Sequence, residues 1–365
     1  RFADNTAGWD GGGLYVESKV CTNTLTLSEV AFERNSSRDG GGLSVIRSVL
    51  NVESATFQEN HASYGGAIRY HQPSSCRHTP VSLQLTNATF ISNTAGYGGA
   101  VFSGGGCSQL NNLTFYGNRA GVAGGAIHND GVSPIFTNLI LWGNQATKGS
   151  QLWDGSGALT LTHSLVQGGD AGISGNTGSA FSDGIGNQDA DPRFMDAAAS
   201  DLRLQPSSPA IDAGDNAALS VGAERDQQGF ARIADGDGDQ IAVVDIGALE
   251  APPAVIYVDD DASGAATGLT WNDALSSLQD VLVWETADTE IWVAVGTYYP
   301  DEGTGVTDDD TFADFRVAYN GIGLYGGFAG DEMTREARDP MANLTILSGD
   351  LQADDEAARQ DGAQV

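Results

Sequence analysis

The sequence predicts an all-β fold, a right-handed parallel β-helix in which each turn of the chain stacks on the turn before it. Three observations predict it: a repeated Phe-x-x-Asn motif, a glycine cluster that follows each copy, and alternating apolar residues that precede it. The repeating unit of about 25 residues suits one turn of three short strands. The right-handed sense follows from the usual chirality of parallel crossovers.

The Phe-x-x-Asn motif provides the core of each predicted turn. Asn tolerates the left-handed backbone conformation of a turn, and stacked amides can hydrogen-bond to the turns above and below. We therefore expect a phenylalanine ladder and an asparagine ladder with a structural rather than catalytic role. After a first copy at Phe2, the ladder positions are Phe32 and Asn35, Phe57 and Asn60, Phe90 and Asn93, Phe115 and Asn118, with a degenerate copy at Leu141 and Asn144.

Glycine doublets or triplets, each followed by an aliphatic residue, come shortly after these asparagines. They begin at Gly11, Gly40, Gly65, Gly98 and Gly124. Glycine allows the backbone to bend tightly where a side chain would collide. Apolar residues that alternate before each Phe, such as Leu25 with Leu27 and Leu83 with Leu85, predict strands with one face inward.

Charge limits the classes of partner. The 365 residues include 48 acidic and 17 basic residues, which gives a net charge of −31. Such a charge repels phosphate backbones, so nucleic acid is excluded as an expected partner. No run approaches the roughly 20 apolar residues that a membrane-spanning helix needs. We therefore expect a soluble acidic surface and no membrane span in this segment.

Two parts of the chain resemble known families of secreted bacterial proteins. The repeats of residues 1–165 resemble the chlamydial polymorphic outer membrane proteins and other surface β-helix proteins, in which Phe-x-x-Asn alternates with Gly-Gly-Ala-Ile. The strings DADPRFMD, DLRLQPSSPAIDAGD and VDIGALE are similar to the C-terminal signature of choice-of-anchor Q proteins. The second resemblance implies that the first β-helix closes near Glu250.

A second β-helix is expected to begin after Pro252 and Pro253. The strings IYVDDDASG, TWNDALSSLQDVL and EIWVAVGTYYP resemble the opening of a fresh β-helix domain in the same secreted families. Thr270 or Asn272 can cap a helix that plugs the open end. Its apolar stripe would be Ala274, Leu275, Leu278, Val281 and Leu282. The expected segments are β-helix repeats in 1–184, a closing region with an Asp-rich loop in 185–251, and a cap with the first turns of a second β-helix in 252–365.

The Asp-rich string that contains Asp235, Asp237 and Asp239 is the best candidate for a metal site. Three carboxylates at alternate positions are typical of loops that surround Ca²⁺ with oxygen. Asp245 is the expected fourth ligand. Gln240 stands where a calcium loop usually has a turn glycine, so a solvated acidic turn is the alternative.

Cysteine positions favour an oxidising, extracellular setting. Cys76 and Cys107 lie at similar places in consecutive repeats, and neighbouring turns about 4.8 Å apart are within reach of a disulfide. We predict a Cys76–Cys107 disulfide. Unpaired cysteines in small core sites are the alternative, and the spacing of His71, Cys76 and His78 matches no zinc pattern.

Function is expected from the repeats and their resemblance. We expect an extracellular or cell-surface structural or adhesive protein that assembles head-to-tail into fibres and is stabilised by Ca²⁺. Its expected partners are further copies, neighbouring domains of a longer chain, or surface glycans. The alternative is a polysaccharide-active β-helix enzyme, a lyase or hydrolase, or a glycan-binding module. The sequence leans against an enzyme, because the aspartates are scattered and the histidines form no series with a nucleophile. In the glycan-binding alternative, the candidate sugar platform is Tyr15, Tyr70, Tyr97 and Trp142.

Overall fold

The computed structural model describes residues 1–351 except 22, 74–82, 156–157, 177–179, 221–222, 240, 283–288, 308–309, 311, 318–321 and 350. The chain forms two compact units. The first contains residues 1–234 and 242–251, and the second contains residues 235–241 and 252–365. Within the described part of the chain, no helix is both long and apolar enough to cross a membrane.

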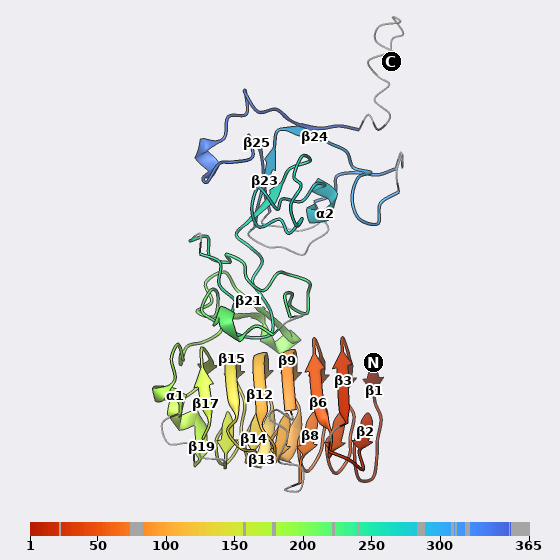
Figure 1. The fold of residues 1–365 in the computed structure, drawn as a ribbon, viewed down its shortest axis with the longest axis vertical. Helices are drawn as coiled ribbons and strands as arrows, with labels where there is room; N and C mark the ends of the chain where they lie inside the picture. The colour runs from red at the N-terminus through yellow and green to blue at the C-terminus, as the bar shows by residue number, and fades with distance from the viewer. Residues whose placement is uncertain are drawn as a thin grey trace, which may run out of the picture. The chain divides into compact units, whose positions relative to one another are not determined.

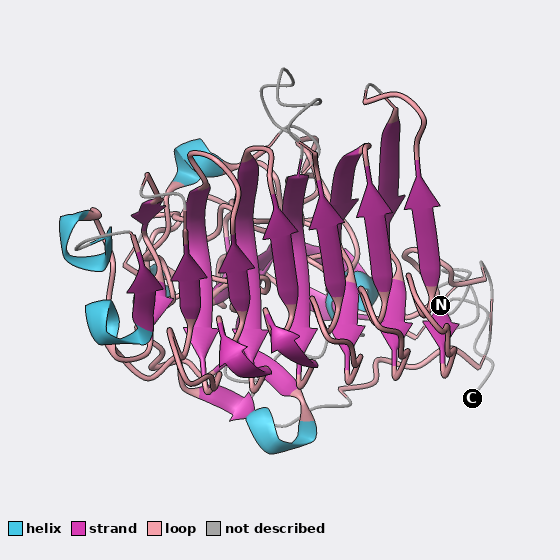
Figure 2. Cartoon of the chain, turned by 90° about the horizontal axis from the view of Figure 1, so that it is seen from below, coloured by secondary structure: helices cyan, strands magenta, loops and turns pink. Residues whose placement is uncertain are grey.

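Two long parallel sheets run along the first unit (Figures 1 and 2). The ten-stranded sheet comprises β1 (Phe2–Ala3), β3 (Thr24–Ser28), β4 (Ala31–Glu33), β6 (Val49–Glu53), β7 (Thr56–Gln58), β9 (Leu83–Ile91), β12 (Ser108–Tyr116), β15 (Ile135–Trp142), β17 (Thr160–Thr162) and β18 (Leu165–Val166). The seven-stranded sheet comprises β2 (Leu14–Glu17), β5 (Leu43–Ile46), β8 (Ile68–His71), β11 (Val101–Gly104), β14 (Ile127–Asn129), β16 (Leu152–Asp154) and β19 (Ile173–Gly175). Two shorter strands, β10 (Thr94–Tyr97) and β13 (Arg119–Ala123), form a separate parallel pair. Each follows a strand of the ten-stranded sheet in the chain and precedes a strand of the seven-stranded sheet.

The pairing register confirms the prediction of an all-β chain of stacked parallel strands. Equivalent residues of successive repeats stand opposite one another, as Phe32 does with Phe57, and Phe57 with Phe90. Strands joined by a long crossover rather than a hairpin can pair in this way. The first unit therefore has a β-helix-like architecture in which each repeat supplies one strand, or two short strands, to the ten-stranded sheet and one strand to the seven-stranded sheet.

The predicted phenylalanine ladder is present in the core. Rings of Phe2, Phe32, Phe57, Phe90 and Phe115 stack with centroids 4.6–5.0 Å apart and planes within 8° of parallel. Four of them, from Phe32 onward, are fully buried. The strand spacing of a sheet sets this separation, so each ring packs on the rings of both neighbouring turns.

The predicted asparagine ladder satisfies every polar group that it buries. Asn93 shows the pattern: its Nδ2 donates to Asn118 Oδ1 at 3.0 Å and to the carbonyl oxygen of Phe57 at 2.9 Å. Its Oδ1 accepts from the backbone N–H and from Nδ2 of Asn60, both at 3.0 Å. Fully buried amides are tolerated only with such partners. The same bonds link Asn5, Asn35, Asn60, Asn118 and Asn144.

Glycine is required at the second position of each cluster. A Cβ on Gly41 would lie 2.3 Å from the carbonyl oxygen of Gly66, and one on Gly66 would lie 2.1 Å from that of Gly99. Backbone of the next turn therefore occupies the space that a side chain would need. The preceding glycine, as at Gly65, has a φ of +62°, which most residues rarely adopt.

The last turns of the stack are covered by the segment around η2 (Gly169–Gly172) and α1 (Ala180–Asp183) (Figure 1). Phe181 of α1 packs against the main core. Within the expected closing region of 185–251, the described residues of 193–234 and 242–251, which we call the strap, pack on the outer face of the ten-stranded sheet.

The strap contains an antiparallel pair, β20 (Phe194–Asp196) and β21 (Asp201–Leu204), and two short 3₁₀ helices, η3 (Ala197–Ala199) and η4 (Asn216–Ala218). An apolar cluster joins it to the sheet. Outward residues of β9 and β15, Ile91 and Ile140, meet Phe194, Leu202 and Ile246 of the strap there. The strap therefore buries one face of a sheet whose other face lines the stacked core.

The second unit contains a parallel sheet of β22 (Val255–Val258), β23 (Glu290–Ala294) and β25 (Gly323–Phe328), and a pair formed by β24 (Gly296–Tyr298) and β26 (Thr345–Leu347). It also contains η5 (Arg335–Ala337) and α2 (Leu278–Leu282). The predicted helix is therefore shorter than expected. Ala274 and Leu275 are buried but not helical, and Ser277 rather than Thr270 accepts the first helical N–H, that of Gln279 at 3.1 Å.

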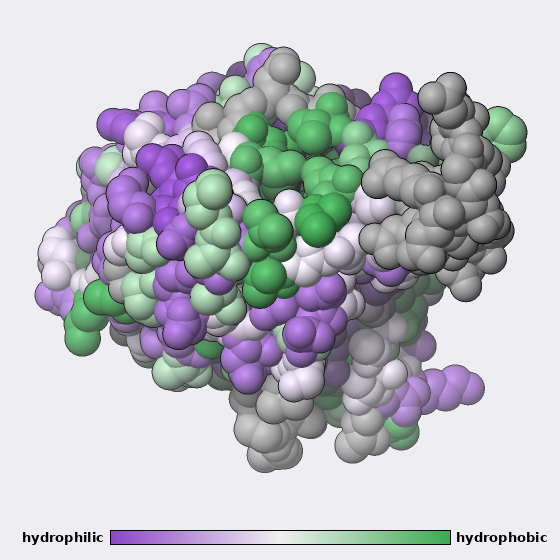
Figure 3. Space-filling model, turned by 90° about the horizontal axis from the view of Figure 1, so that it is seen from above, coloured by the Kyte–Doolittle hydropathy of each residue, from purple (hydrophilic) through white to green (hydrophobic). Residues whose placement is uncertain are grey.

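Apolar side chains also remain on the surface of the second unit. Leu324 of β25 and Ile346 and Leu347 of β26 are 39–47% exposed. Figure 3 shows apolar side chains gathered on the face that it views. Contiguous exposed apolar surface is a feature of interaction sites.

Candidate functional site

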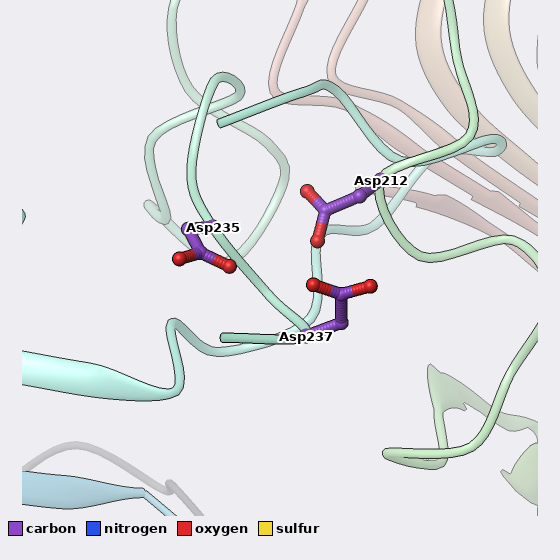
Figure 4. Close-up of side chains that lie close together, drawn as sticks. All are labelled: Asp212, Asp235 and Asp237. Carbon is purple, nitrogen blue, oxygen red and sulfur yellow. The ribbon is translucent and has the colours of Figure 1, made fainter. Parts of the chain in front are cut away.

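Three of the four predicted metal ligands belong to one Asp-rich loop, which forms a series of tight turns. Oδ1 of Asp235 accepts from Gly238 N at 2.6 Å, that of Asp237 from Asp239 N at 3.0 Å, and that of Asp239 from Ile241 N at 2.8 Å. Figure 4 draws Asp235 and Asp237 of this loop together with Asp212. Carboxylate oxygens of this kind suit a hard cation such as Ca²⁺.

Asp245, the fourth predicted ligand, belongs instead to a buried polar cluster of the first unit. It is 2% exposed, and its carboxylate accepts from Asp212 N at 2.8 Å and from Ala251 N at 2.6 Å. Burial raises the pKa of Asp245 to about 7. Its two oxygens are thus engaged by backbone N–H groups, because the chain folds back on itself after the loop.

Arg232 is the centre of this buried cluster. Its guanidinium, fully buried, lies 2.6 Å from Glu250 Oε1 and donates to Asn87 Oδ1 at 2.7 Å. It also donates to the carbonyl oxygens of Gly247 and Ala248. Burial raises the pKa of Glu250 well above its usual range, and nearby Asp245 adds to that rise. One arginine therefore fastens the strap to Asn87 of the stacked turns.

The predicted disulfide is not formed by Cys107. This residue carries a thiol whose Sγ donates to the carbonyl oxygen of Ser133 in the next repeat at 3.2 Å, and burial raises the pKa of the thiol. The spacing of turns brings the two positions within reach of each other, but the direction of the side chain decides which partner the thiol meets. Cys76, the other half of the prediction, and His78 lie outside the described residues.

The predicted sugar platform is only partly correct. Tyr70 is fully buried, and its hydroxyl donates to the carbonyl oxygen of Ser48 at 3.0 Å. Trp142 is half-buried against the apolar cluster beneath the strap. Tyr15 is 41% exposed, and Tyr97 is half-buried and stacks on Tyr64. These four aromatic residues therefore do not form one surface.

A different aromatic group lies on the outer face of the seven-stranded sheet. Phe102, His128 and Trp153 occupy equivalent outward positions of β11, β14 and β16. Phe102 stacks on His128 with centroids 5.0 Å apart, and His128 stacks on Trp153 at 4.2 Å. Tyr64 meets Phe102 edge-on at 5.3 Å. We call these four residues the outer aromatic cluster.

A groove of about 650 Å³ opens beside this cluster, and we call it the aromatic groove. Phe102 and Tyr64 provide its rings, and Gly104 and Gly105 provide backbone. A Cβ on Gly104 would lie 3.0 Å from His71 Nδ1 and 3.1 Å from Phe102 Cε1. The groove therefore exists partly because residue 104 has no side chain.

Charged residues of both signs line the aromatic groove: Arg38, Asp39, Arg69 and Asp130. The guanidinium of Arg69 lies 3.5 Å from Asp10 Oδ1 and 3.8 Å from Asp39 Oδ2, both on earlier turns. Arg38 lies over the ring of Trp9 at 5.0 Å, a cation–π contact.

His71 and Asp130 complete the polar lining of the aromatic groove. Burial, and then the charge of Arg69, lowers the pKa of His71 below 6.5, so its imidazole is neutral at neutral pH. Asp130 is exposed, and its Oδ2 lies 3.3 Å from His128 Nε2. A neutral imidazole and a solvated carboxylate can both exchange hydrogen bonds with a polar ligand.

A larger groove of about 970 Å³ lies where the strap stops covering the ten-stranded sheet. Its acidic lining includes Glu29, Glu53 and Asp201, and Arg203 and Arg225 are its basic residues. Hydroxyl, amide and aliphatic side chains make up most of the rest, and no aromatic ring is among its lining residues. We therefore give more weight to the smaller aromatic groove as a specific binding site.

Sequence reasoning missed Tyr64, Phe102 and Trp153 as surface aromatics. One signal was present. Each strand that follows a glycine cluster alternates inward and outward residues, so Phe102, between inward Val101 and Ser103, had to face outward. Aligning the repeats in this register would have placed Phe102, His128 and Trp153 in one row.

A short part of the chain matches a known family. Residues 112–130 match the family model described as the Chlamydia polymorphic membrane protein repeat. The matched segment includes Phe115, Asn118 and the glycine doublet at Gly124, and it runs from β12 to just beyond β14. The similarity therefore concerns the repeat unit. Neither the curated proteins nor the solved structures that were searched gave a match.

Proposed function

We propose that this chain is an adhesin-like protein of the bacterial cell surface. The observation that carries the proposal is the match of residues 112–130 to the repeat of the polymorphic membrane proteins. The same signature is stacked from Phe2 to Asn144, which makes the matched unit typical of the first unit. We include in the proposal a right-handed winding with about 25 residues per turn, and a choice-of-anchor Q-type identity for residues 185–251.

The test of location is accessibility on intact cells. An antibody raised against the full chain should label unpermeabilised cells of the source bacterium, and external protease should remove the label. A cytoplasmic enzyme is the control that must stay protected. Labelling that requires permeabilised cells would contradict the proposal.

We further propose that copies or neighbouring domains associate end to end. Among the described residues, β1 and β26 are each at one edge of their sheet, and edge strands have N–H and C=O groups that another strand can pair with. Exposed Leu324 and Ile346 supply apolar surface in the second unit. Electron microscopy of the native protein should show fibres with a regular axial repeat. Sedimentation of a single species at every protein concentration would contradict fibre assembly.

Calcium binding by Asp235, Asp237 and Asp239 is part of the same proposal. Its support is the alternation of carboxylates in a loop of tight turns. Titration of the full chain with Tb³⁺, a luminescent substitute for Ca²⁺, should give a saturable signal that Ca²⁺ displaces. The variant Asp237→Asn should weaken that signal at least tenfold, whereas Asp4→Asn, an exposed control, should not. Equal signals from both variants would contradict the site.

A polysaccharide-active enzyme is the second candidate function, and the larger groove is the observation that favours it. Glu29, Glu53 and Asp201 line that groove, and glycoside hydrolysis requires a pair of carboxylates on either side of the bond. Incubation of soluble polysaccharides with the full chain, with and without Ca²⁺, tests this candidate. New reducing ends or unsaturated uronates that disappear in Glu53→Gln would support an enzyme.

A further inference from the structure

We propose that the aromatic groove binds a pyranose ring of a neutral glycan. The inference deepens the proposed adhesive function, because it names the class of ligand that the seven-stranded face would hold. It rests on three features of the described residues: the rings of Phe102 and Tyr64 in the lining of the groove, hydrogen-bonding groups around them, and a balance of charge in the lining. Each feature is independent of fibre assembly and of calcium.

The place of Phe102 beside the groove follows from the direction of the side chains in the outward row. His128 covers one face of Phe102, at 5.0 Å. On the other side, the equivalent position of the preceding turn is Arg69. Its guanidinium reaches back to Asp10 and Asp39, on turns that come earlier still. Phe102 and Tyr64, which meet edge to face with centroids 5.3 Å apart, both line the groove, and the C–H face of a pyranose is the kind of surface that packs on such rings.

The volume of the groove and its polar groups suit a sugar rather than an apolar ligand. At about 650 Å³ the groove is within the roughly 300–1,000 Å³ range of small-molecule sites. Arg38, His71 and Asp130 stand around the rings of Phe102 and Tyr64. A hydroxyl group both donates and accepts, so it can bond to a carboxylate, a guanidinium or a neutral imidazole.

Charge selects a neutral glycan over an acidic one. Arg38 and Arg69 are balanced within the groove by Asp39 and Asp130, and His71 adds no charge at neutral pH. Asp10 and Asp39 further hold the guanidinium of Arg69. The chain as a whole carries a net charge of −31, which repels polyanions. A uronate-rich chain would therefore meet no net positive surface at this site.

The test uses the full chain and soluble oligosaccharides. Neutral probes are the hexamers of cellulose, xylan and mannan together with maltohexaose, and the acidic probe is hexagalacturonate. Isothermal titration calorimetry should detect binding of at least one neutral hexamer and weaker or no binding of the acidic one. Phe102→Ala should lower the affinity about tenfold, which is the scale of losing one aromatic contact and its polar surroundings.

Two variants separate ligand loss from misfolding. Arg38→Ala changes an exposed groove side chain and should lower the affinity several-fold at an unchanged melting temperature. Tyr15→Ala is the matched control, since Tyr15 is an exposed aromatic in the same outward row that does not line the groove, and it should bind as the unmodified chain does. Absence of binding by all neutral probes, equal binding by all variants, or tighter binding of hexagalacturonate would overturn the inference. None of these results would affect the cell-labelling test of location.

Discussion

A single side-chain amide in the ladder forms hydrogen bonds with several buried polar groups. Asn93 makes four side-chain hydrogen bonds, which link Asn60, Phe57 and Asn118 on the neighbouring turns. Such a residue is more than a turn former. It lets the chain bury backbone carbonyls and N–H groups at a corner where the strands do not pair them.

Replacing Asn93 by Ala should therefore lower the stability of the first unit markedly. The change removes the acceptor of the backbone N–H of Asn60 and takes one bond each from Asn60 Nδ2 and the carbonyl oxygen of Phe57, at about 1–3 kcal/mol for each buried group left without a partner. Urea unfolding, followed by far-UV circular dichroism, measures the loss. Asn5→Ala, at the exposed end of the same ladder, is the control and should cost much less. Equal losses in the two variants would contradict this account.

Glycines of one cluster should differ sharply in their tolerance of a methyl group. Gly41→Ala would place a Cβ 2.3 Å from a backbone oxygen, so we expect poor folding or a large fall in melting temperature. Gly42→Ala should be tolerated, because Ala67 and Ala100 hold the equivalent place in the following turns. Differential scanning calorimetry of the two variants decides the matter. Similar melting temperatures would show that the close approach is not restrictive.

At the scale of elements, the strap shows what the sequence predicts and what it leaves out. Repeats predicted the sheets, because each unit carries its own apolar alternation and its own turn residues. Individual side-chain hydrogen bonds, by contrast, join the strap to the stacked turns. Gln227 Nε2 donates to the carbonyl oxygen of Ala55, and Asn138 Nδ2 donates to that of Asp215. These partners are 172 and 77 residues apart in sequence. No periodicity marks such contacts, so the docking of the strap on the ten-stranded sheet could not be predicted from the sequence.

The candidate sites also have parts that the sequence predicted and parts that it did not. Spacing alone predicted the carboxylates of the Asp-rich loop, but it placed Asp245 with them although that side chain is buried elsewhere. The aromatic groove depends on which way Arg69 extends and on the absence of a side chain at Gly104. The sequence shows the glycine, but it does not show which way Arg69 extends or that the two features meet at one groove.

Removal of the buried guanidinium should release the strap while the ladders persist. Arg232→Met leaves the buried carboxyl of Glu250 without its charged partner, and breaking a buried pair in this way typically costs about 3–5 kcal/mol. Hydrogen exchange followed by mass spectrometry should show faster exchange in residues 223–234 and 242–251 and little change around Phe57 and Phe90. Arg203→Met, which breaks a pair exposed to solvent with Asp201, is the control. Uniform acceleration across the first unit would contradict a locally fastened strap.

Acid should strengthen the strap over a defined pH range. The carboxyl of Asp245 has a pKa of about 7 when folded and 3.8 as its ordinary value, so the folded chain binds an extra proton between these values. Stability contributed by this group is thus fully present below pH 4 and is lost as pH rises through 7. We expect the free energy of unfolding to rise by a few kcal/mol at most between pH 8 and pH 5.

Asp245→Asn is the variant that isolates this linkage. It should reduce the pH dependence without abolishing it, because the pKa of buried Glu250 is raised as well, whereas the exposed control Asp130→Asn should keep it in full. Chemical unfolding at a series of pH values provides the measurement. An unchanged slope in Asp245→Asn would mean that other carboxyls cause the effect.

At the scale of the whole molecule, excess negative charge acts on every part of the chain. With 48 acidic and 17 basic residues, the folded chain repels itself at low ionic strength. Raising NaCl from 20 to 300 mM shortens the screening length and should stabilise the protein by about 1 kcal/mol, or about 2–4 °C in melting temperature. A fall in melting temperature over this range would show that attractive ion pairs outweigh the repulsion.

The strap has a mechanical consequence. It is bonded to Ala55 and Asn87 in earlier turns and to Asn138 in a later one, so it crosses several turns that otherwise contact only their neighbours. A tensile load along the stack would open the turns that the strap does not cross one at a time. Turns crossed by the strap would have to yield together, with the buried contact between Arg232 and Asn87 broken at the same moment. Under pulling, the covered part of the stack would break later and more abruptly than the first turns.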